Sequence, residues 1–209
     1  MKRPRIYLAG PDLFYPDADQ RYARLKAICA ERGLDGVAPT DGQHFPIEPT
    51  TDGARRLRRH DLATLQSCDA VLANITPFNG LEPDSGTAYE MGFAAACGMP
   101  VAAYCLDGQD THLRALRAGR LIDTDGRDDE GLLVENFGLA ANLMLCAAHA
   151  TFFNPDGSAE HLVATLAVST PQAAPREQLH SQCEDLAVID KAGRSLRAVE
   201  TTQGARIAP

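Results

Sequence analysis

The segment 82–98, EPDSGTAYEMGFAAACG, contains a predicted helix from about residue 86 to residue 97 in which Glu90 is the only charged side chain. A helix that is apolar on all sides is usually buried on most of them. Burying a carboxylate costs several kcal/mol, so a carboxylate kept in such a helix suggests a chemical task. The alternative is a solvated surface glutamate, which is the usual situation for this residue type.

A sheltered carboxylate can attack the anomeric carbon of a sugar and form a covalent glycosyl intermediate. Glu90 lies in the first or second turn of its predicted helix, where the helix dipole is expected to keep it ionised. The mechanism needs a second acidic group, and two are available: Asp84, shortly upstream, and Asp61, on the preceding predicted helix. Asp84 has an alternative role as a helix cap that accepts the Thr87 N–H, and Asp61 as a partner of Arg58 or as an exposed residue.

The elements that position these residues follow an alternating pattern. Short apolar runs separated by helical patterns are typical of a parallel sheet with crossover helices, so we expect an α/β, doubly wound, flavodoxin-like fold. The predicted strands are 6–9, 36–38, 70–75 and 101–105, and the predicted helices are 17–32, 52–67, 86–97 and 132–149. The segment 107–130 is polar and glycine-containing, without a predicted element.

Polar residues follow the ends of three predicted strands. They are Asp12 after the first, Asp41 and Gln43 after the second, and the segment 76–84 after the third. In an open parallel sheet the ligand binds beyond the carboxyl ends of the strands, so these residues can converge on one pocket. The loop AGPDLFYPD after the first strand lacks the GxGxxG pattern, which disfavours a dinucleotide site.

Composition narrows the classes of ligand. The chain of 209 residues has a net charge of −8 and a pI near 5.2, which argues against nucleic-acid polymers and anionic membranes as partners. No run of apolar residues is long enough for a membrane helix and no signal peptide is evident, so we expect a cytoplasmic protein. The six cysteines and six histidines are scattered, so we expect buried free thiols, no metal and no cofactor.

The composition changes after Thr151. We expect a catalytic domain over 1–150 and a C-terminal appendage over 151–209, with a linker at 169–178 and two short strands within 186–199. We expect the appendage to act as an arm at an interface between subunits.

Residues 4–146 resemble the nucleoside 2-deoxyribosyltransferase family. The resemblance rests on an ordered set of segments: IYLAGPDLF at the first strand, PTDGQ at 39–43, the passage from Asp61 to Asp69, DSGTAYEMGFA at 84–94 and NLM at 142–144. It implies transfer of 2-deoxyribose between purine or pyrimidine bases in nucleoside salvage, without a cofactor.

The resemblance also implies roles for the acidic residues and for one tyrosine. Glu90, in the family's small-x-x-x-E-[LM]-G helix, is the implied nucleophile. Asp84 would hold the hydroxyls of the deoxyribose, and Asp61 would exchange a proton with the nucleobase. Tyr7 would line the site and hydrogen-bond the nucleophile; from its strand position alone, inward packing is the simpler interpretation.

Four further residues are implied to bind substrate. Gln43 would contact the base, and Gly10 and Phe14 would lie against the substrate in the loop after the first strand. Asn142 corresponds to a residue that the family donates to the sugar from a neighbouring subunit, which implies a homo-oligomer with a shared site. From the residues alone, Gln43 could be a surface residue and Asn142 could join two helices in a core.

Two other functions remain open. A 2-deoxynucleoside 5′-monophosphate N-glycosidase resembles this family, but usually has a serine at the place of Asp84, and an aspartate there would repel a phosphate. The arginines of ARRLRRH, 54–60, could nevertheless reach a phosphate, although a solvated helix face is the simpler interpretation. The second alternative is a non-catalytic nucleoside or nucleotide sensor, which has no need of a nucleophile.

Overall fold

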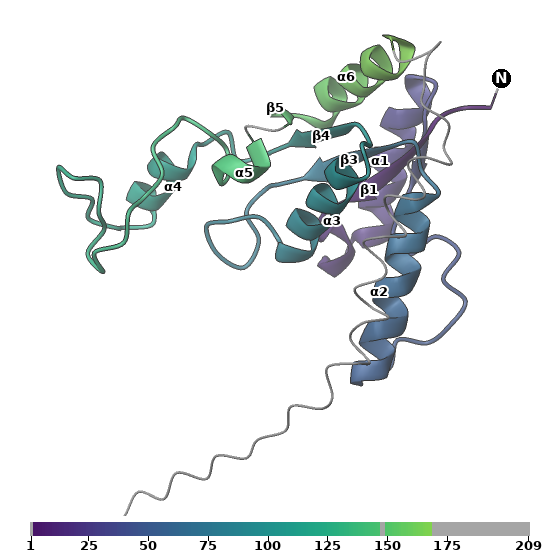
Figure 1. Ribbon diagram of the computed structural model, residues 1–209, viewed down its shortest axis with the longest axis horizontal. Coiled ribbons are helices and arrows are strands. Elements are labelled where there is room, and N and C mark those ends of the chain that lie inside the picture. Colours follow the sequence, from purple (N-terminus) through teal and green to yellow (C-terminus); the bar gives the residue numbers. More distant parts are fainter. Residues whose placement is uncertain (1, 147–148, 169–209) are drawn as a thin grey trace, which may run out of the picture. The chain divides into compact units, whose positions relative to one another are not determined.

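The computed structural model describes residues 2–146 and 149–168, and its centre is a five-stranded sheet in the order β2-β1-β3-β4-β5 (Figure 1). Every pair of neighbouring strands is parallel. This is the strand order of a flavodoxin-like, doubly wound sheet, as predicted. The strands are β1 (Arg5–Ala9), β2 (Asp35–Val37), β3 (Ala70–Asn74), β4 (Val101–Tyr104) and β5 (Ala150–Phe152).

Helices cover both faces of this sheet. On one face α1 and α6 pack together, and on the other α2 packs against α3 (Figure 1). The helices are α1 (Ala18–Glu31), α2 (Thr51–Gln66), α3 (Ser85–Ala96), α4 (Thr111–Arg117), α5 (Leu143–Cys146) and α6 (Pro155–Val168), with a short 3-10 helix η1 (Pro11–Phe14).

Alternation along β1 decides which side chains reach the site. Ile6 and Leu8 belong to the core beneath α1 and α6, whereas Tyr7 and Ala9 belong to the core beneath α2 and α3. All four side chains are buried, as expected for a parallel strand covered on both faces. Tyr7 is thereby turned toward the helix that carries Glu90.

The predicted boundary after residue 150 differs from the structure. β5 pairs with β4, and α6 packs on β3 and β4, so both lie in the same compact unit, Met1–Pro171. Without β5 the edge of β4 would be unpaired, and without α6 the core that α6 shares with α1 would be partly uncovered. The predicted linker at 169–178 and the strands within 186–199 lie outside the described residues.

The helix predicted over 132–149 is wrong. Among the described residues of this segment only Leu143–Cys146 is helical, and Gly138 has a φ of 67°, outside the right-handed helical range. The apolar residues that suggested a buried helix are largely exposed; they include Leu132, Leu133, Phe137 and Met144. The chain then re-enters the sheet as β5.

A short helix, α4, lies within the polar segment 107–130 where no element was predicted. It begins at Asp110, whose side chain accepts the backbone N–H of Leu113 at 2.7 Å. This aspartate cap is an ordinary signal for a helix start, but the surrounding charges obscured it. In the described part of the chain, no helix is long and apolar enough to cross a membrane.

Candidate active site

The site is centred on Glu90, in the second turn of α3. Its Oε1 accepts a hydrogen bond of 2.6 Å from the hydroxyl of Tyr7 in β1. The two residues lie on either side of the point where the strand order reverses between β1 and β3, which is where open α/β sheets bind ligands. Glu90 is partly buried, in agreement with the sheltered carboxylate inferred from its helix.

The protonation of Glu90 differs from the expectation that the helix dipole keeps it ionised. The pKa of Glu90 is raised from its ordinary 4.5 to about 7. Burial is the largest cause, the Tyr7 hydrogen bond lowers the pKa in part, and the negative charges of Asp61 and Asp84 contribute to the rise. Desolvation outweighs the dipole here because Glu90 lies beyond the first turn, where the dipole field has weakened. The same effects, burial and the charge of Glu90, raise the pKa of Tyr7.

Asp61 lies on α2, and its negative charge contributes to the raised pKa of Glu90. Burial raises the pKa of Asp61 from 3.8 to about 6, with His60 opposing the shift. A carboxyl group with a pKa near neutrality can both donate and accept a proton under physiological conditions. No hydrogen bond joins Asp61 to Arg58 among the described residues; Arg58 instead donates to the hydroxyl of Tyr89 at 2.8 Å.

Asp84 is the N-cap of α3. Its Oδ2 accepts the backbone N–H of Thr87 at 2.8 Å and the Thr87 hydroxyl at 3.0 Å. The capping role considered from the sequence is therefore present. It fixes the Asp84 carboxylate at the start of the helix that carries Glu90, and the charge of Asp84 acts on Glu90.

The loop after β1 carries Gly10 and Phe14. A side chain at Gly10 would meet Cβ of Asn74 at 2.7 Å and Oδ2 of Asp12 at 2.9 Å, so only glycine fits. The buried Asp12 accepts a hydrogen bond of 2.8 Å from Asn74 and so joins this loop to β3. Phe14 is 57% exposed and its ring stacks on Phe78, with the centroids 5.2 Å apart.

The loop after β2 carries Gln43 and Asp41. The Gln43 amide donates to the backbone carbonyl of Phe45 at 3.1 Å, and the ring of Phe45 packs edge-on against His60 beside Asp61. Asp41 pairs with Lys26 at 2.7 Å and accepts the backbone N–H of Ala38, so it shapes the loop.

Asn142 does not lie within a helix, as the sequence suggested, but directly before α5, and it is exposed. Its side-chain amide donates to Glu135 at 2.7 Å, and the other oxygen of Glu135 accepts the backbone N–H of Leu143 at 2.9 Å. α5 packs against α3, so Asn142 is presented near the helix of Glu90.

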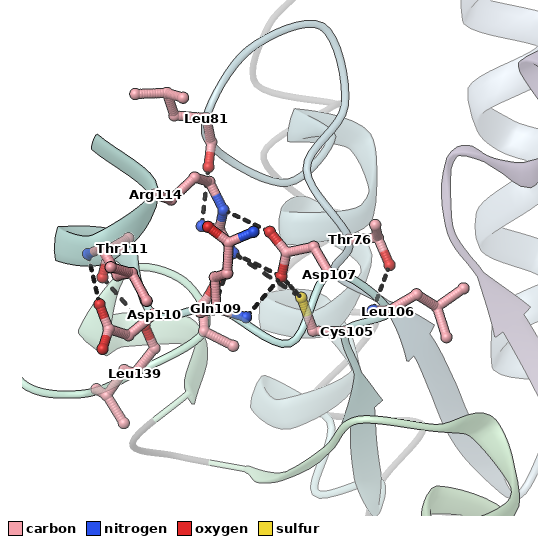
Figure 2. Close-up of polar contacts among 12 residues, drawn as sticks. Thr76, Leu81, Cys105, Leu106, Asp107, Gln109, Asp110, Thr111, Arg114 and Leu139 are labelled. Carbon is pink, nitrogen blue, oxygen red and sulfur yellow. Dashed lines mark hydrogen bonds and ion pairs between the residues drawn. The ribbon is translucent and has the colours of Figure 1, made fainter. Parts of the chain in front are cut away.

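Two features of the site escaped sequence reasoning. The first is the buried Tyr22 of α1, which packs in the core beneath α1 and α6; burial, followed by the charges of Asp12, Glu90 and Asp61, raises its pKa. The second is the buried Arg114 of α4, which joins the loop after β3 to the segment before Asn142 (Figure 2). Tyr22 lies within the predicted helix 17–32, whereas no element was predicted around Arg114, and the contacts that define both roles join residues distant in sequence.

Among residues 2–146 and 149–168, no three His, Cys, Asp or Glu side chains lie together as a metal site requires. Cys29, Cys68, Cys105 and Cys146 are free and buried, as expected, but Cys97 is disulfide-bonded, so the expectation of free thiols is wrong for that residue.

The strand order defines an α/β protein of the doubly wound class, in which ligands bind beyond the carboxyl ends of the strands at the switch point, here between β1 and β3. The family described as nucleoside 2-deoxyribosyltransferase matches residues 6–144. The chain belongs to this family, as its sequence segments indicated.

Individual proteins are similar to this chain in sequence or in fold. A 2-deoxyribosyltransferase from Leishmania mexicana is 30% identical, with a TM-score of 0.62 over 77% of this chain and 97% of that one. An uncharacterized protein of Schizosaccharomyces pombe is 33% identical over 159 residues, which are 68% of this chain and 75% of the relative. A conserved protein of Enterococcus faecalis V583, 20% identical, has a TM-score of 0.50 over 79% of this chain and 98% of that one, and shares the fold.

Proposed function

We propose that this protein transfers 2-deoxyribose between nucleobases through a covalent intermediate on Glu90. The observation that carries the proposal is the partly buried Glu90 carboxylate, hydrogen-bonded to Tyr7 and influenced by Asp61 and Asp84. Such an arrangement supplies a nucleophile, an acid–base group and a group able to bind sugar hydroxyls. A sugar without a 2-hydroxyl reaches its oxocarbenium-like transition state easily, so these groups suffice for the chemistry.

The reaction has two halves. In the first, a Glu90 oxygen attacks C1′ of the deoxyribose as the C1′–N bond breaks, and Asp61 gives a proton to the departing base. In the second, a nitrogen of another base attacks C1′, the bond from C1′ to Glu90 breaks, and Asp61 takes up the proton that the base releases. Water in place of the second base gives hydrolysis as a side reaction.

The protonation states of Glu90 and Asp61 are compatible with these two reaction steps. The reaction requires Glu90 ionised and Asp61 protonated, and their pKa values are about 7 and about 6. Because Glu90 has the higher pKa, only a minority of molecules has both groups in the required state, and this fraction is greatest between about pH 6 and pH 7.

Asp84 and its surroundings favour unphosphorylated nucleosides over 5′-monophosphates. The acidic side chain would repel a phosphate near the sugar. Of the four arginines of α2 that could attract a phosphate, three have partners within the chain: Arg55 pairs with Asp52 at 2.9 Å, Arg56 pairs with Glu48 at 3.9 Å, and Arg58 donates to the hydroxyl of Tyr89. We therefore retain the transferase as the preferred function and the monophosphate N-glycosidase as the alternative to be tested.

We also propose that the site is completed by a neighbouring subunit of a homo-oligomer, with Asn142 reaching the sugar of the adjacent site. The side chain of Asn142 is exposed and oriented by Glu135, as a donated residue should be. Exposed apolar side chains in the same segment support an interface there, since patches of this kind commonly mark association surfaces. They are Leu132, Leu133, Phe137, Leu143 and Met144.

One assay separates the candidate functions. The protein is incubated with deoxyinosine and adenine, and with dAMP in parallel, and the products are separated by chromatography. Deoxyadenosine and hypoxanthine are expected from the first mixture. Cleavage of dAMP without any reaction of the deoxynucleosides would favour the monophosphate N-glycosidase, and no product from either mixture would favour the sensor.

A further inference from the structure

Arg114 of α4 is buried, with 6% of its surface exposed, and its guanidinium contacts several parts of the chain (Figure 2). Nε and Nη2 donate to the two oxygens of Asp107, at 2.8 and 3.2 Å. This two-pronged ion pair neutralises a charge that would otherwise be costly to bury. Nη2 also donates to the carbonyl of Gln109 at 3.2 Å.

The remaining contacts of Arg114 reach two segments that carry proposed substrate-binding residues. Nη1 donates to the carbonyl of Leu81 at 3.0 Å, and Nη2 donates to the carbonyl of Ala140 at 3.0 Å. Leu81 is three residues before Asp84, and Ala140 is two residues before Asn142. One side chain therefore holds the backbone next to both residues.

The loop that contains Leu81 is itself a closed turn. The N–H of Phe78 donates to the carbonyl of Glu82 at 3.0 Å, and Asn79 has a positive φ of 52°. The turn closes at Glu82, and only Pro83 separates Glu82 from Asp84, so Arg114 holds the backbone that leads directly into Asp84. Two further bonds close the arrangement: Thr76 accepts the N–H of Leu106 at 3.0 Å, and Thr111 donates to Leu139 (Figure 2).

Glu82 adds a direct link between the same two segments. Burial raises its pKa, and the Arg114 charge and a hydrogen bond from the Asn142 backbone oppose the rise. Arg114, Glu82 and Asn142 thus lie in one polar cluster.

We propose that Arg114 is a positioning residue for sugar binding: it fixes the backbone that carries Asp84 of its own site and Asn142, which reaches the adjacent site, and it does not contact the elements that bind the base. This inference rests on the proposed function. The base-side residues Asp61 and Gln43 lie on α2 and the loop after β2, and none of the contacts of Arg114 reaches them. Loss of Arg114 should therefore affect the two substrates unequally.

The experiment compares kcat/KM for the deoxynucleoside donor and for the acceptor base in the exchange reaction. In Arg114→Ala we expect kcat/KM for the donor to fall about 10- to 100-fold, since misplacement of binding groups is costly. For the acceptor base we expect a change within about twofold, because the sugar is then covalently attached. Arg114→Lys keeps the charge but lacks the planar fork, so it should show the same asymmetry, reduced in size.

Two further variants keep the test decisive if Arg114→Ala folds poorly. Asp107→Asn weakens the anchor of Arg114 without removing the guanidinium, and should give the same donor-selective loss. Arg32→Ala is the matched control, because Arg32 pairs with Asp156 and Glu160 and joins α1 to α6 on the other face of the sheet. It should lower the melting temperature without changing the ratio of the two kcat/KM values.

The outcomes separate the inference from the proposed function. Equal losses for donor and acceptor in the Arg114 and Asp107 variants, or a ratio no different from that of Arg32→Ala, would overturn the positioning role while the wild type still exchanges bases. Absence of exchange by the wild-type protein would contradict the proposed function itself, and the positioning role with it.

Discussion

The hydroxyl of Tyr7, in the middle of β1, donates a hydrogen bond of 2.6 Å to Oε1 of Glu90 in α3. The bond joins the first strand to a helix 83 residues later, across the switch point of the sheet. Because a hydrogen bond to the charged form favours ionisation, Tyr7 opposes the rise that burial imposes on the Glu90 pKa. Tyr7 therefore helps to keep the proposed nucleophile in its reactive form.

Tyr7→Phe should raise the pKa of Glu90 and lower the transfer rate at pH 6.5 about 10-fold, because less of the carboxylate is ionised. The limb of the pH–rate profile that belongs to Glu90 should move to higher pH. Tyr22→Phe is the control, since Tyr22 is another buried tyrosine whose pKa these carboxylates influence, and Glu90 is not among its hydrogen-bond partners in the described residues. An unchanged profile in Tyr7→Phe would show that the hydrogen bond has no influence on the chemistry.

The pH dependence of kcat/KM should be bell-shaped with a maximum near pH 6.5. Its limbs should lie near pH 6 and pH 7, from Asp61 and Glu90, because the reaction requires Asp61 protonated and Glu90 ionised. In Asp61→Asn the falling limb should vanish, leaving activity that rises with pH to a plateau. The plateau should lie about 100-fold below the maximum of the wild type, as is typical for loss of a general acid. A bell that survives in Asp61→Asn would remove Asp61 from the role of proton donor.

The raised pKa of Glu90 also has a consequence for stability. Because the folded protein binds this proton more tightly than the unfolded chain between pH 4.5 and about pH 7, the stabilising contribution is complete below pH 4.5 and is lost as the pH rises to about 7. Glu90→Gln cannot ionise and should melt about 2–4 °C above the wild type at pH 8, but not at pH 4. Glu130→Gln, in an exposed loop, controls for loss of one negative charge. A lower melting temperature for Glu90→Gln at both pH values would contradict the buried, charge-destabilised carboxylate.

Four of the five strands and the helix of Glu90 were predictable because their signals are local, whereas β5 was not predicted. Continuous apolar runs such as residues 70–75 identify buried parallel strands, and a lone carboxylate in an apolar helix identifies Glu90. The segment 132–149 was misread because many of its large apolar side chains, such as Leu132, Leu133 and Phe137, are exposed instead of forming one face of a helix. Local sequence cannot distinguish apolar residues that cover a core from apolar residues that lie on the surface.

The electrostatic state of the site could not be predicted from local patterns. The pKa of Glu90 depends on Asp61, on Asp84 and on the depth of burial, all of which follow from packing between α2 and α3. Arg114 was equally hidden, since its partner Leu81 is 33 residues away and offers only a backbone carbonyl. Contacts of this kind leave no residue-type signature at either position.

The covalent step is the central claim, and its most direct test is the mass of the protein after reaction with a donor alone. The enzyme is mixed with deoxyinosine, quenched rapidly in acid and digested, and the peptides are weighed. We predict a peptide containing Glu90 that is heavier by one 2-deoxyribosyl group, and no such adduct in Glu90→Gln. Base exchange by the wild type with no adduct on Glu90, or an equal adduct in Glu90→Gln, would contradict the account.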